Sequence, residues 1–70
     1  MARLETSSDD WHKFNEKADK ILRKHSDART SAEREKWERK AEELIDYMRS
    51  KYGYDDNVER IISMYYLDRL

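Results

Sequence analysis

The amino-acid sequence predicts an all-α protein: a three-helix bundle with antiparallel neighbouring helices and a long central helix. Three segments carry apolar residues at the three- and four-residue spacing of a helix, and each follows a Ser, Thr or Asp that can cap its first turn. No segment alternates with the period of two that a half-buried strand requires. With 70 residues, the chain predicts a single domain, residues 1–70.

The first helix is predicted over about residues 8–25, and we expect residues 1–6, which show no period, to fray. Ser7 and Asp10 have the spacing of a capping box at its start. Its apolar positions fall on one side of a helical wheel: Trp11, Phe14, Ala18, Ile21, Leu22 and His25. A line of lysines occupies another side, as is typical of a solvated face: Lys13, Lys17, Lys20 and Lys24.

Residues 26–29 form a polar connector without glycine or proline. The chain can break there or continue as helix, which would give one long rod. Thr30 and Glu33 have capping-box spacing, and this signal favours a break.

The central helix is predicted over residues 31–52, which are nearly all good helix formers. Its apolar stripe consists of Trp37, Ala41, Leu44, Ile45, Met48 and Tyr52. Gly53, the only glycine, is expected at a left-handed position that ends the helix, with Tyr54 packing back on the last turn. So short a link predicts that the next helix lies antiparallel to the central one.

The third helix is predicted over about residues 56–69, capped by Asp55 or Asp56. It carries more apolar residues than one core face needs. We predict that this surplus binds a partner, with Tyr47 at the edge of the central stripe joining it: Tyr47, Met64, Tyr66, Leu67 and Leu70. The alternative is that the third helix is simply the most buried element.

The charge balance disfavours two classes of partner. Fifteen Lys and Arg against sixteen Asp and Glu give a net charge of −1, spread evenly along the chain. Attraction to nucleic acid or to an anionic membrane is therefore not favoured. No apolar run is long enough for a signal peptide or a transmembrane segment, which predicts a soluble cytoplasmic or recombinant product.

The sequence holds no constellation typical of an enzyme. No serine is paired with a histidine, no glycine-rich phosphate loop is present, and there is no cysteine. Asp9, His12 and Glu16 share one side of the first helix, but a di-metal bundle needs such a motif on two helices. We therefore predict no cofactor, no metal and no small-molecule substrate.

Two functions follow as expectations. The first is a non-enzymatic interaction module that binds a protein partner or a second copy of itself through the third helix. The alternative is a small nucleic-acid-binding regulator of helix-turn-helix type. Its reading helix would present Asn57, Arg60 and Arg69 to base edges, against the opposing charges of Glu59 and Asp68.

In its caps, its lack of proline and cysteine, and its Glu-, Lys- and Arg-rich faces, the chain resembles computationally designed or engineered small helical-bundle proteins. The resemblance covers the whole chain but involves no motif, so it transfers no functional residue. It implies a fold exercise, a self-assembling bundle or a binder. Five tyrosines, three methionines and the crowded run over residues 61–66 depart from idealised designs.

Overall fold

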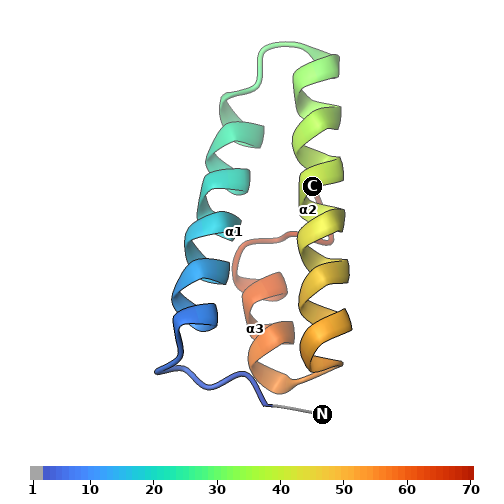
Figure 1. Cartoon of the computed structure of the whole chain (residues 1–70). Coiled ribbons are helices and arrows are strands. Elements are labelled where there is room, and N and C mark those ends of the chain that lie inside the picture. Colours follow the sequence, from blue (N-terminus) through green and yellow to red (C-terminus); the bar gives the residue numbers. More distant parts are fainter. Residues whose placement is uncertain (1–2) are drawn as a thin grey trace.

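The computed structural model describes residues 3–70, and among these it contains three helices and no strand. Helix α1 spans Asp9–Asp27, α2 spans Ser31–Tyr52 and α3 spans Asp56–Met64. The first two form a long antiparallel hairpin, and α3 packs behind the end of it where α1 begins (Figure 1). The predicted all-α bundle is confirmed.

The connection between α1 and α2 breaks the helix, so the long-rod alternative is wrong. Helix α1 continues two residues beyond the predicted end, and Ala28 is extended with φ −63° and ψ 130°. The Thr30 hydroxyl accepts a hydrogen bond from the Glu33 N–H at 3.1 Å, as the capping box predicted. The Glu33 carboxylate accepts from the Arg29 N–H at 3.5 Å, one residue before the expected donor.

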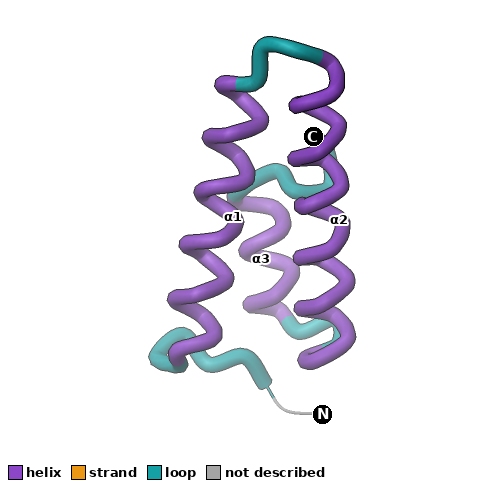
Figure 2. The backbone as a smooth tube through the Cα atoms, turned by 45° about the horizontal axis from the view of Figure 1, so that its top comes forward, coloured by secondary structure: helices purple, strands orange, loops and turns teal. Residues whose placement is uncertain are grey.

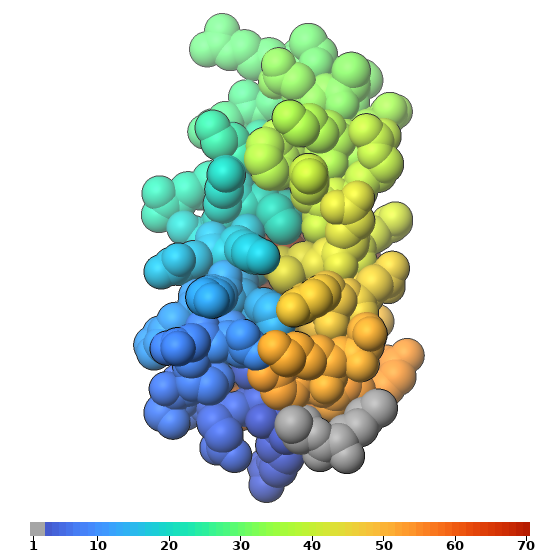
Figure 3. Space-filling model, in the orientation of Figure 1, coloured from blue at the N-terminus to red at the C-terminus, as the bar shows by residue number. Residues whose placement is uncertain are grey.

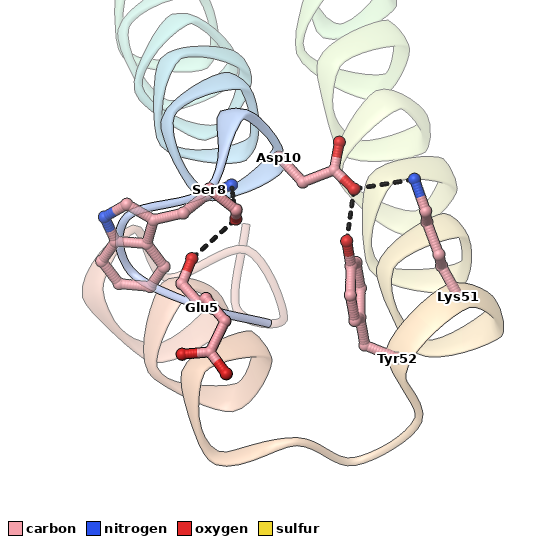
Figure 4. Close-up of polar contacts among 6 residues, drawn as sticks. Glu5, Ser8, Asp10, Lys51 and Tyr52 are labelled. Carbon is pink, nitrogen blue, oxygen red and sulfur yellow. Dashed lines mark hydrogen bonds and ion pairs between the residues drawn. The ribbon is translucent and has the colours of Figure 1, made fainter. Parts of the chain in front are cut away.

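Helix α1 begins at Asp9, close to the predicted start, but its cap is not the predicted capping box of Ser7 and Asp10. Ser8 is the cap, because its hydroxyl accepts from the Trp11 N–H at 3.2 Å and donates to the Glu5 carbonyl at 2.6 Å (Figure 4). The Ser8 side chain thus stabilises both the first turn of α1 and the turn before it.

The prediction that residues 1–6 fray is wrong for the part that the structure describes; residues 1–2 lie outside it. Leu4 is buried in the core. The Asn57 side-chain amide donates to the Leu4 carbonyl at 2.8 Å. The N-terminal segment therefore packs against the start of α3, 53 residues further along the chain.

Gly53 ends α2 with positive φ, as predicted, but not in the left-handed helical region. Its φ of 70° and ψ of −151° form a combination that is essentially restricted to glycine. Tyr54 lies back on the last turn of α2, where the Arg49 guanidinium is 4.7 Å from its ring centroid. The residue is 79% exposed, so this contact buries little of it.

Helix α3 ends at Met64, not at residue 69. Tyr66 adopts a left-handed backbone with φ 55°. The Leu67 N–H donates to the Ile62 carbonyl at 3.0 Å and the Tyr66 N–H to the Ser63 carbonyl at 3.3 Å, which together form a Schellman motif. The turn folds Leu67 into the core, where it is 3% exposed. Burying this side chain offsets the cost of a non-glycine residue at the left-handed position.

One apolar cluster joins all three helices with the N- and C-terminal segments. Its buried members are Leu4, Phe14, Ala18, Ile21, Ala41, Leu44, Ile45, Met48, Val58, Ile61, Ile62 and Leu67. Figure 2 shows that α3 lies beside only part of the hairpin, after which residues 65–70 cross back toward α2. Within residues 3–70, no helix combines the length and the apolar character needed to cross a membrane.

Candidate functional site

The five residues predicted to bind a partner do not form one surface. Leu67 lies in the core and Leu70 is half-buried against it, contrary to the expectation that both are exposed. The reason is the turn after Met64, which moves them out of helical register. Met64 and Tyr66 remain 47% and 55% exposed at the end of α3. Tyr47 belongs to the α1–α2 hairpin.

A hollow of about 610 Å³ opens on the hairpin between α1 and α2, and we call it the α1–α2 groove. Its lining contains no α3 residue: Lys17, Lys20, Ile21, Lys36, Trp37, Lys40, Glu43, Leu44 and Tyr47. Figure 3 shows the face of the molecule on which α1 and α2 meet, and Figure 1 shows α3 behind them in the same orientation. The groove and α3 therefore use different sides of the same hairpin.

The helical repeat explains why these side chains converge. Lysines spaced three and four residues apart on α1 stay on one side of that helix, and Lys36 and Lys40 do the same on α2. The antiparallel hairpin brings the two sides to the same face. Ile21 and Leu44 are buried beneath them, whereas Tyr47 stays 54% exposed with its ring edge-on to Phe14, at 5.9 Å between centroids.

The lining of the groove is mostly basic, and its lysines form no ion pair within residues 3–70. Four lysines face one carboxylate, that of Glu43. The ion pairs within residues 3–70 involve other side chains: Asp19–Arg23, Arg49–Glu59 and Asp10–Lys51. Glu38 is hydrogen-bonded to His25. The Lys36 ammonium lies 5.3 Å from the Trp37 ring centroid, which places a cation beside the apolar floor.

The opposite charge collects elsewhere. A second hollow of about 310 Å³, beside the C-terminal segment, is lined by three carboxylates and three aliphatic residues: Glu38, Glu42, Asp68, Ile45, Leu67 and Leu70. A net charge near zero thus conceals a basic face and an acidic one. Sequence reasoning missed the basic face, although Lys36 and Lys40 flank Trp37 at a spacing that could have been matched to the lysine line of α1.

A polar cluster closes the end of the bundle near Gly53. Asp10, in the first turn of α1, accepts a hydrogen bond from the Tyr52 hydroxyl and pairs with the Lys51 ammonium at 2.7 Å (Figure 4). The contacts with Lys51 and then Tyr52 lower the pKa of Asp10. The bond to Asp10 in turn raises the pKa of Lys51, and, together with burial, that of Tyr52. This cluster ties the start of α1 to the end of α2.

The other candidate residues are dispersed or engaged in structural contacts. No three acidic or imidazole side chains converge as a metal site requires within residues 3–70, so Asp9, His12 and Glu16 share only a helix side. The Asn57 amide is bonded to the N-terminal segment, and Arg69 lies beyond the end of α3. Among residues 3–70, the α1–α2 groove alone combines a hollow, a partly exposed tyrosine and lysines that form no ion pair.

Comparison with protein-family models, with curated proteins and with solved structures found no match.

Proposed function

We propose that this protein is a non-enzymatic interaction module that binds another protein through the α1–α2 groove. The proposal rests on one observation: lysines from both helices border a groove whose floor is aromatic and aliphatic and is partly exposed. These lysines form no ion pair within residues 3–70. Clustered apolar surface bordered by polar groups is typical of protein interfaces, where tyrosine and tryptophan are enriched. This moves the expected binding surface from the third helix to the hairpin.

Self-association is the second form that an interaction module could take. A symmetric dimer through the groove would set lysines against lysines, and such like-charge contacts cost several kcal/mol. The exposed Met64 and Tyr66 offer a different edge for a second copy. The two surfaces can be tested separately because they share no residue.

An unbiased peptide selection tests the groove. Random displayed peptides would be selected on the immobilised protein and then assayed on two variants of equal net charge. Lys17→Glu/Lys40→Glu reverses charge in the groove, and the control Arg60→Glu/Arg69→Glu reverses it on the α3 side. We expect the enriched peptides to lose at least about tenfold in affinity on the first variant and little on the control. Equal losses, or no enrichment, would contradict a binding groove.

Light scattering over about a hundredfold dilution tests self-association. If the wild type forms a homo-oligomer through the α3 edge, its mean mass should fall on dilution. The variant Met64→Glu/Tyr66→Lys should then have the mass of a monomer at every concentration. Both side chains are about half-exposed, so this variant should keep its fold. A strict monomer at high concentration would exclude the homo-oligomer and leave the groove proposal standing.

A further inference from the structure

We infer that the α1–α2 groove binds an acidic amphipathic helix of a partner protein, about three turns long. The inference rests on the proposed function and specifies the chemistry of the partner. It follows from three features of the groove: its length, its apolar floor and the charge of its two rims.

The length of the groove fits a short helix. Lys36 and Tyr47 mark its extent along α2, and eleven residues of helix rise by about 16 Å. A partner helix of about eleven or twelve residues covers that distance. The side between two packed helices is where a third helix docks in a bundle, and α3 occupies such a position on the other side of this hairpin.

The floor of the groove requires an apolar stripe on the partner. Ile21, Leu44 and Trp37 lie between the rims, and Tyr47 stands at one end. A helix laid in an apolar groove anchors through residues at positions i, i+3, i+4 and i+7. The aliphatic part of this floor suits such side chains.

The rims require acidic residues on both flanks of that stripe. Lys17 and Lys20 border the groove from α1, and Lys36 and Lys40 border it from α2. Because the lysines stand on both sides, the complementary surface is an apolar stripe with Asp or Glu on each side. A single-stranded nucleic acid would also meet the lysines, but the molecule as a whole carries a net charge of −1.

Binding can be measured with a matched set of labelled peptides of about fourteen residues. The first has Leu or Phe at helical spacing with Glu on both flanks. The second has the same composition in scrambled order, and the third has Lys in place of every Glu. A single-stranded oligonucleotide of similar length is the fourth probe. Fluorescence anisotropy gives the affinity, and circular dichroism reports any helix formed on binding.

We expect only the first peptide to bind well and to gain helix as it does so. Lys17→Glu/Lys40→Glu should weaken it at least about tenfold, while Arg60→Glu/Arg69→Glu changes it less than about twofold. Glu43→Lys removes the one acid in the groove and should tighten binding. Raising the salt from about 50 to about 300 mM should weaken it severalfold, because the paired charges are solvent-exposed.

Several outcomes would overturn the inference. If the scrambled peptide binds as tightly as the first, binding depends on charge and composition and not on a helical apolar stripe. Tighter binding of the oligonucleotide than of the first peptide would assign the groove to nucleic acid. No binding of the first peptide at millimolar concentration would rule out the acidic helix directly.

The failure of this inference can be distinguished from that of the proposed function. If the random selection yields groove-dependent peptides that lack acidic residues or helical spacing, the groove still binds protein, but the partner class is wrong. If the selection yields no groove-dependent peptide and the acidic helix also fails, both are wrong.

Discussion

Tyr66 has a left-handed backbone that disfavours every residue with a Cβ atom. Tyr66→Gly should therefore raise the free energy of unfolding by about 0.5–1 kcal/mol, since the ring is more than half exposed and contributes little packing. Denaturant unfolding measures the change. Tyr66→Ala is the matched control: it removes the ring but keeps the Cβ atom, so the gain should be absent. A gain of equal size in the alanine variant would contradict backbone strain as its cause.

Asp10 makes stability depend on pH at the acid end. Its pKa is lowered in the folded state by Lys51 and Tyr52, so its contribution is present above its unfolded pKa and is lost as the pH falls through the folded value. Asp10→Asn should be less stable than wild type at neutral pH, and the difference should shrink as the pH falls below the unfolded pKa of about 3.9. Chemical unfolding at several pH values checks this. A difference that is constant with pH would contradict the assignment.

The same cluster acts in the opposite sense at the alkaline end. Asp10 raises the pKa values of Lys51 and Tyr52 in the folded state, so their contribution is complete below their unfolded values and is lost as the pH rises through the folded ones. Wild type should therefore lose stability above about pH 10 more steeply than Asp10→Asn.

The residue-level predictions succeed where the signal is local. Thr30 and Asp55 cap helices because their side chains reach N–H groups only two or three residues away. Ser7 and Ser8 both satisfy the cap preference, and only the turn formed with Glu5 selects Ser8. Tyr66 gave no signal, because a left-handed residue is normally read from a glycine or an asparagine.

The N-terminal segment is an element of the fold although it has no regular secondary structure. Leu4→Ala should lower the free energy of unfolding by about 2–4 kcal/mol, because it leaves a cavity against the core. Thr6→Ala, two residues away and exposed, should change it by less than about 0.5 kcal/mol. Thermal unfolding of both variants compares them. Similar small effects would mean that this segment does not contribute to the core.

The bounds of the elements could be predicted to the extent that helical periodicity decides them. Helix α2 begins and ends as predicted, because its stripe and both end signals agree. Helix α3 does not, since apolar residues continue at helical spacing past Met64 while packing favours a turn that buries Leu67. The role of Leu4 could not be predicted either, because the Asn57 amide that binds its carbonyl lies 53 residues further along the chain.

The whole molecule is held more firmly at one end than at the other. The N-terminal segment, α3 and the Asp10 cluster all lie at the end where α1 begins, whereas the connector at residues 28–30 joins only two helices. Backbone amides over residues 22–26 and 34–38 should exchange with solvent at least about tenfold faster than those over residues 14–18 and 44–48. Hydrogen exchange followed by NMR checks this. Uniform protection would show one cooperative unit.

The basic groove could not be predicted from charge counted along the chain. Acidic and basic residues are spread evenly along the sequence, and the hairpin brings the lysines of two helices to one groove. The lysine line on α1 was visible as a helix side, but its alignment with Lys36 and Lys40 depends on where the connector turns. Position in the fold, rather than composition, creates this site.

The two hollows differ in charge, with four lysines and one carboxylate lining the α1–α2 groove and three carboxylates lining the other. A cation-exchange surface at neutral pH meets the protein one face at a time, so it can hold the lysine-rich side although the net charge is −1. The molecule would then be retained in a single orientation, with α3 and the acidic hollow turned toward the solvent. The net charge is close to zero, yet the groove side would bind to a cation exchanger.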